Sequence, residues 1–182
     1  MKHGKSVAIV GLGGIFPDAP TLEAFWNNIV NGVNSSRRPP KGRWLLEPEE
    51  VYDRRIGAPD KVNSAQGCYI EGALGPLPEG LAIDPDFAAG LDPLFHLLLH
   101  AGHRAFAGGM TNTLDRSRVG VIIGHLALPS ESASTLARDW LGRTFEERLL
   151  GESRVGPPVV AAVNHRVAGL PAGLLARALG LG

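Results

Sequence analysis

The sequence has little cysteine and no excess of either charge, and each shortage excludes a class of protein. Cys68 is the only cysteine among 182 residues, so no disulfide can form within the chain, which fits a reducing compartment. The 18 Lys and Arg side chains balance 18 Asp and Glu side chains. Because a nucleic-acid-binding surface needs a surplus of basic charge to neutralise phosphates, we expect no nucleic acid as the main partner.

Long hydrophobic runs are also missing. The uninterrupted run at residues 7–10 is shorter than a signal-peptide core, and no small-residue cleavage site follows it. The apolar C-terminal stretch is interrupted by Asn164, His165, Arg166, Pro171 and Arg177. A membrane-spanning helix needs about 20 predominantly apolar residues. We therefore expect no membrane contact and a cytoplasmic location.

The residues that are present indicate a globular α/β chain. Residues 6–12 and 119–124 are apolar without alternation, as in buried strands of a parallel sheet, and 68–70 is a third, short strand candidate. Asp84-Pro85 and Asp92-Pro93 have the pattern of helix starts. Helices are predicted at 21–32, 93–107, 130–141, 146–150, 159–168 and 174–179. Residues 33–67, rich in Pro, Arg, Ser and Gly, are predicted to form a long surface loop.

The glycines in VAIVGLGGIFP, residues 7–17, raise the question of a phosphate-binding turn. Gly11 and Gly13 fit the first half of G-x-G-x-x-G, but Phe16 stands where the third glycine belongs. Residues 17–20 then delay the helix whose amide groups would meet a phosphate. Nucleotide binding is thus disfavoured, and close packing of the glycine backbone at a strand end is the alternative.

The same stretch continues into a longer pattern, VAIVGLGGIFPDAPTLEAFWNNIVNGVNS. It resembles the opening of β-ketoacyl synthase domains, the condensing enzymes of polyketide and fatty-acid assembly. The matching residues are Gly11, Gly13, Phe16, Pro17, Leu22, Phe25, Trp26 and Gly32. The resemblance continues through 39–44, 61–70, 83–85, 91–99, 118–124 and 162–166, where Ala162 to Arg166 is similar to the family's A-N-R-I-S segment.

The resemblance implies an α/β, thiolase-like fold with five α-β-α-β-α layers. Residues 1–182 are expected to form an incomplete N-terminal half of it, truncated before the nucleophilic cysteine. Such a partial fold predicts a large exposed apolar surface. The short segment 86–91 resembles synthases of the polyunsaturated-lipid or glycolipid type.

The residues that carry chemistry in this family are absent from the chain. The resemblance implies decarboxylative Claisen condensation of acyl thioesters, in which a cysteine thiolate takes the acyl group and two histidines assist. Cys68 matches a loop position, not the nucleophile, and is expected to be a small apolar filler. No catalytic residue is assigned, and the chain alone is predicted to be inactive. A non-catalytic scaffold or interaction protein with the same fold is the alternative.

The resemblance also implies partners for the intact enzyme, namely an acyl carrier protein and a second copy in a homodimer, with no cofactor. Arg37, Arg38, Lys41 and Arg43 form a basic cluster in the long loop. One interpretation is docking of an acidic carrier protein, and the other, which we favour, is an ordinary solvated loop.

Three histidines share one face of the helix expected at 93–107. His96, His100 and His103 could bind zinc, but no carboxylate or cysteine is near in sequence, and leucines dominate this helix. We therefore prefer a hydrogen-bonded or solvated histidine stripe and predict no metal site.

Two further polar pairs have simple structural interpretations. Ser130 and Ser132 do not lie in a G-x-S-x-G elbow, and Ser130 is interpreted as a helix cap. Glu146 and Glu147 are interpreted as a solvated helix face, not as an acid/base pair.

Overall fold

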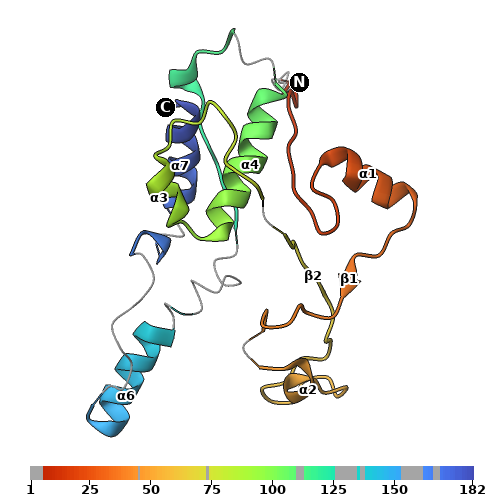
Figure 1. Cartoon of the computed structure of the whole chain (residues 1–182), viewed down its shortest axis with the longest axis vertical. Helices are drawn as coiled ribbons and strands as arrows, with labels where there is room; N and C mark the ends of the chain where they lie inside the picture. Colours follow the sequence, from red (N-terminus) through yellow and green to blue (C-terminus); the bar gives the residue numbers. More distant parts are fainter. Residues whose placement is uncertain are drawn as a thin grey trace, which may run out of the picture. The chain divides into compact units, whose positions relative to one another are not determined.

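The structure is a computed structural model that describes residues 6–44, 46–72, 74–109, 113–125, 135, 138–152, 162–165 and 169–182. The chain divides into two compact units. The larger unit comprises Met1–Gly13 and Leu74–Gly182, and the smaller unit is Gly14–Ala73. Figure 1 labels the helices and strands of both units.

The larger unit is organised around helix α4 (Pro93–Ala107), which packs along helix α7 (Leu170–Leu179), with the short helix α3 (Pro85–Ala89) preceding it (Figure 1). Phe95 and Leu99 of α4 are 0% exposed, because their spacing of four residues places both on one helix face. The core cluster consists of Leu91, Phe95, Leu99, Leu174, Leu175, Ala178 and Leu179. A side chain at Gly102 would lie 2.5 Å from Leu175, so glycine at this position lets α7 approach α4 closely.

The helix starts predicted from Asp-Pro pairs are confirmed. The Asp84 carboxylate accepts a hydrogen bond from Phe87 N at 2.8 Å, and the Asp92 carboxylate accepts one from Leu94 N at 2.9 Å. Each aspartate thus satisfies a backbone N–H that has no partner within its helix. Helix α4 also ends at Ala107, as predicted from the sequence.

The smaller unit contains helix α1 (Leu22–Val30), helix α2 (Pro48–Val51) and two short antiparallel strands, β1 (Ser36–Arg37) and β2 (Gly67–Cys68). The strands pair in the register Ser36↔Cys68 and Arg37↔Gly67. Thr21 caps α1, as predicted, by accepting a hydrogen bond from Ala24 N at 3.2 Å. The predicted long loop thus includes a strand and a helical turn of its own.

The two longest predicted strands are not found as strands. Residues 6–12 and 119–124 run without helix or ladder, and the sheet among the described residues has only two strands, β1 and β2. Val7 is 94% exposed and Ile122 is 98% exposed. The prediction was wrong because apolar, β-branched composition favours extended backbone, whereas a strand also needs a neighbour to accept and donate its hydrogen bonds.

The remaining elements differ from the predictions mainly at their ends. Helix α6 (Arg143–Leu150) follows a π-helical turn, η3 (Arg138–Gly142), and begins before the predicted residue 146. The short 3-10 turns are η2 (Arg116–Arg118) and η4 (Ala162–His165), the latter inside the helix predicted at 159–168. Most of the helix predicted at 130–141 lies outside the described residues. No helix in the described part of the chain is long and apolar enough to cross a membrane.

Candidate functional site

The glycines of the first apolar segment lie against the backbone of α4. A Cβ atom at Gly11 would lie 2.1 Å from the Ala105 carbonyl oxygen, and one at Gly13 would lie 2.3 Å from the Ala101 carbonyl oxygen. Only glycine leaves room for such close approach. The contacts are with the C-terminal half of α4, not with a helix N-terminus where a phosphate could bind. The interpretation as close backbone packing is therefore confirmed.

Asn164, in turn η4, connects two segments that are far apart in the sequence. Its side-chain oxygen accepts a hydrogen bond from Asp92 N at 2.8 Å, and its side-chain nitrogen donates to the Gly90 carbonyl oxygen at 2.9 Å. Asn164 is buried, and of the two hydrogen bonds the one with Asp92 N is buried and the one with Gly90 is partly buried. The amide thus fixes the corner between α3 and α4. The sequence placed Asn164 in the A-N-R-I-S-like segment but did not indicate its role.

Arg116 makes a second connection, which the sequence analysis missed. Its guanidinium lies 5.5 Å from the centre of the Phe106 ring and donates a hydrogen bond to the Leu179 carbonyl oxygen at 3.0 Å. The Arg116 carbonyl oxygen accepts a hydrogen bond from Gly182 N at 3.1 Å. Turn η2 is thereby held to the ends of α4 and α7. The basic pair Arg116 and Arg118 gave no signal that one member would stabilise helix ends.

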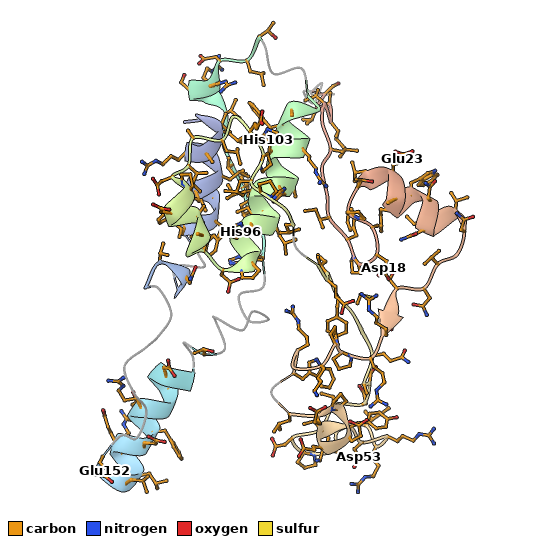
Figure 2. The ribbon with its side chains drawn as sticks, in the orientation of Figure 1. Asp18, Glu23, Asp53, His96, His103 and Glu152 are labelled. Atoms are coloured by element: carbon orange, nitrogen blue, oxygen red, sulfur yellow. The ribbon has the colours of Figure 1, made fainter. Side chains whose placement is uncertain are left out.

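The three predicted histidines lie on α4, and His96 and His103 are labelled in Figure 2. His100 is 5% exposed, and its Nε2 atom has no hydrogen-bond partner among the described residues. Burial lowers the pKa of His100, and the nearby charge of Arg104 lowers it further. His100 is thus neither hydrogen-bonded at Nε2 nor solvated, which corrects that part of the prediction. In the described part of the chain, no group of three or more possible ligands is placed to hold a metal ion.

Two of the four basic side chains of the cluster form ion pairs with acidic side chains. The Arg37 guanidinium pairs with Asp18 at 2.8 Å and Glu71 at 2.7 Å, and these acidic partners raise its pKa. Arg38 pairs with Glu49. Arg37 therefore has an internal role that neither sequence interpretation, carrier docking or a solvated loop, included.

Cys68 lies in β2 and is exposed, so the interpretation as a small apolar filler is wrong. The error arises because its neighbours Tyr69 and Ile70 indicate a buried strand, whereas β2 pairs only with β1. Ser130 and Ser132 lie outside the described residues. Glu146 and Glu147 lie on α6, as predicted, with Glu146 half-buried and Glu147 exposed.

The described residues thus form a framework of closely packed backbone, buried hydrogen bonds and helix-end contacts. No described thiol lies in a buried site next to a histidine: the only cysteine, Cys68, is exposed. The sequence model of the family described as "Beta-ketoacyl synthase, N-terminal domain" matches residues 4–172.

Among curated proteins, Polyketide synthase PksL of Bacillus subtilis (strain 168) is 31% identical over 125 residues, which are 65% of this chain and 3% of that protein. Polyketide synthase PksR of the same organism is 35% identical over 116 residues, or 62% of this chain and 4% of that protein. Norsolorinic acid synthase of Dothistroma septosporum is 32% identical over 127 residues, or 66% of this chain and 5% of that protein. The chain thus spans only a small part of the length of these relatives.

Among solved structures, the "PfaC Keto synthase-Chain length factor" matches with a TM-score of 0.75 at 26% identity, over 96% of this chain and 20% of that chain. An oxazolomycin ketosynthase domain of a Streptomyces albus strain matches with a TM-score of 0.52 at 21% identity, over 95% of this chain and 27% of that chain, which concerns the fold alone. These matches confirm the predicted partial α/β fold of the thiolase-like type, although the two longest predicted strands are unpaired.

Proposed function

Because this chain belongs to the β-ketoacyl synthase family, we propose that it forms the N-terminal part of a domain that joins acyl thioesters by decarboxylative Claisen condensation. The family match over residues 4–172 is the observation that carries the proposal. In the complete domain, a cysteine thiolate would take the acyl group, and histidines would assist decarboxylation and stabilise the enolate. We assign none of these roles to a residue of this chain.

The contribution of this chain would be positional. Gly11 and Gly13 let the first apolar segment lie directly on α4, and Asn164 fixes the start of α4. Catalysis by oriented groups is sensitive to small displacements, so a fixed α4 would give the rest of the domain a defined surface to pack against. The exposed side chains of Val7, Ile9 and Ile122 supply apolar area for that packing.

The partners of the complete domain belong to the same proposal. An acyl carrier protein would deliver the acyl groups as phosphopantetheine thioesters, and the complete domain would act as a homodimer in polyketide or fatty-acid biosynthesis in the cytoplasm. Lys41 and Arg43 are the members of the basic cluster that form no ion pair with a described residue. Their positive charges, rather than that of Arg37, are the better candidates for contact with an acidic carrier.

An acylation assay tests the first part of this proposal. The 182-residue chain is incubated with a radiolabelled acyl thioester, denatured and examined for covalently bound label. We expect none, because Cys68, the only cysteine of the chain, lies in β2 and does not match the position of the family nucleophile. Label that persists after denaturation and disappears in Cys68→Ser would contradict the assignment.

The alternative is a non-catalytic framework with the same fold, favoured by one observation: the matching solved structure is named both for a keto synthase and for a chain length factor. A chimera separates the two functions. Residues 4–172 replace the matching segment of polyketide synthase PksL, and condensation is measured together with the melting temperature. A folded chimera that condenses acyl groups supports the catalytic framework. A folded chimera that forms no acyl-enzyme supports the non-catalytic one.

A further inference from the structure

Helix α1 ends at Val30 and is followed by Asn31-Gly32, the only Asn-Gly pair in the sequence. Both residues of the pair are exposed. The side-chain amide of an asparagine can be attacked by the next backbone nitrogen, and glycine hinders this attack least because it has no Cβ atom. Apart from its chain neighbours, no atom lies within 4 Å of the position that a Cβ atom of Gly32 would take. Packing therefore does not shield Gly32 from water.

Asn31 closes the last turn of α1 with its own side chain. Its Nδ2 atom and its backbone N both donate to the Asn27 carbonyl oxygen, at 2.8 Å and 3.0 Å. Gly32 N donates to the Ile29 carbonyl oxygen at 3.1 Å. The attacking nitrogen is thus held in a hydrogen bond until the turn opens. Because α1 has no buried residue, little apolar packing opposes this opening.

We propose that Asn31 is a modification site, where water converts the side-chain amide to a carboxylate through a cyclic imide formed with Gly32. Gly32 N bonds to Asn31 Cγ and loses its proton, the bond from Cγ to Nδ2 breaks, and ammonia leaves with that proton. Water then adds to one of the two imide carbonyl carbons and breaks its bond to the nitrogen. Hydrolysis at Cγ gives aspartate, and hydrolysis at the backbone carbonyl carbon gives isoaspartate. Either step releases one proton, and water is the only co-reactant.

The product cannot close the turn as Asn31 does. A carboxylate has no N–H to donate to the Asn27 carbonyl oxygen. Its negative charge also lies at the C-terminal end of α1, where the helix dipole is already negative, and the last turn has no basic side chain to compensate for it. Isoaspartate in addition lengthens the backbone by one methylene group. The modification therefore loosens the end of α1, and the inference goes beyond the proposed function because no acyl transfer is involved.

Prolonged incubation of the full 182-residue chain at mildly alkaline pH tests the proposal, with peptide mapping by mass spectrometry as the readout. The peptide that contains Asn31 is expected to gain the mass of the amide-to-carboxylate change and to separate into two products. Only the isoaspartate product accepts a methyl group from a protein isoaspartate methyltransferase. Asn34 and Asn63, each followed by serine, are internal controls. Their conversion should be about tenfold slower, which corresponds to a barrier higher by about 1.4 kcal/mol.

Two glycine variants separate hindrance at the attacking nitrogen from simple loosening of the turn. Gly32 has a φ of 62°, so Gly32→Ala strains and loosens the turn while its new methyl group hinders the attack. We expect slower conversion of Asn31 in this variant. Gly42→Ala is the matched control, because Gly42 is also exposed, has a φ of 77° and does not follow an asparagine. It should leave the rate unchanged, and faster conversion in Gly32→Ala than in the native chain would overturn the proposal.

An aspartate variant tests the consequence for α1 without waiting for the reaction. In Asn31→Asp, amide hydrogen exchange at residues 31–33 should be about two- to fivefold faster, because a like charge at a helix end costs about 0.3–1 kcal/mol. Asn34→Asp is the control for charge, since the Asn34 side-chain oxygen accepts from Ser36 N at 2.9 Å and a carboxylate keeps that acceptor. Equal exchange at residues 31–33 in both variants, or conversion of Asn34 and Asn63 as fast as that of Asn31, would overturn the inference.

Discussion

The two units of the chain are stabilised by different interactions. The larger unit has a buried apolar core, in which Phe95 and Leu99 of α4 pack with Leu174 and Leu175 of α7. Among the described residues of the smaller unit, Ala19 is the only hydrophobic residue that is buried. Helix α1 has no buried residue, and Phe16 stacks on Phe25 with ring centres 4.0 Å apart.

What holds the smaller unit instead is a set of polar contacts between residues that lie 11 to 34 positions apart in the sequence. Arg37 bridges Asp18 and Glu71, and Lys61 Nζ donates to the Glu50 carbonyl oxygen at 2.5 Å. Exposed ion pairs contribute little free energy and are screened by salt, whereas apolar burial is insensitive to moderate salt. The comparison therefore predicts that core substitutions affect the larger unit most and that salt affects the smaller unit most.

The strongest test of this comparison is Phe95→Ala. Phe95 is fully buried, so the substitution removes apolar contacts and leaves a cavity. We expect the free energy of unfolding of the larger unit to fall by about 3–5 kcal/mol, measured by urea denaturation with α-helical circular dichroism. Phe87→Ala in α3 is the control, because Phe87 is 41% exposed and its loss is expected to be much smaller. Equal losses for the two variants would show that the core is not closely packed.

A smaller effect is expected where the backbone approaches α4. In Gly13→Ala the new methyl group would lie 2.3 Å from the Ala101 carbonyl oxygen, so the segment or the helix must shift. Overpacking of this kind costs about 1–3 kcal/mol, and the melting temperature should fall accordingly. Gly173→Ala on α7 is the matched control, because nothing lies within 4 Å of its added methyl group. An unchanged melting temperature in Gly13→Ala would contradict the observed contact between this segment and α4.

Parts of the larger unit could be predicted from the sequence because their signals are local. The Asp-Pro pairs predicted the starts of α3 and α4, and the glycines of the first apolar segment predicted close backbone packing, which Gly11 and Gly13 make against α4. The residue pattern of residues 7–35 also predicted the family. The pairing of residues 6–12 could not be predicted, because a strand depends on a partner that composition does not reveal.

The contacts that position the candidate site are non-local, and so they gave little sequence signal. Asn164 lies 72 residues from Asp92 and 74 from Gly90 in the sequence, yet its amide reaches both. Arg37 looked like one member of a basic cluster, but its partner Glu71 is 34 residues away. Spacing rules describe neighbours on one helix or strand, and neither contact is of that kind.

The pH dependence of stability tests whether the core of α4 tolerates charge. Because burial lowers the pKa of His100 in the folded state, the unfolded chain binds the proton more readily. Stability is therefore complete above the unfolded pKa of about 6.5 and falls as the pH drops through the range down to the folded pKa. Between these two pKa values, the free energy of unfolding decreases by at most about 1.4 kcal/mol for each pH unit. Melting curves from pH 8 to pH 5 should show this decline in the native chain and a smaller one in His100→Gln.

The smallest effect is expected in the smaller unit, from Arg37→Gln. The substitution removes the ion pairs with Asp18 and Glu71. Asp18 has a backbone φ of 55°, a conformation that residues other than glycine rarely adopt. The two hydrogen bonds from Arg37 to the Asp18 carboxylate help to hold the backbone in this conformation. Faster amide hydrogen exchange is therefore expected at residues 16–19 and 67–71, with no change in α4 or α7.

A change in salt concentration and a matched variant test whether the loss of the Arg37 ion pairs causes the faster hydrogen exchange. Near 1 M salt, exposed ion pairs are largely screened, so native chain and Arg37→Gln should exchange at more similar rates in the smaller unit. Arg54→Gln removes an exposed arginine that forms no ion pair with a described residue, and its exchange should match that of the native chain. If Arg37→Gln instead accelerates exchange in α4 and α7 as much as in residues 16–19, the two units do not depend on separate interactions, and the contrast between an apolar core and a polar network fails.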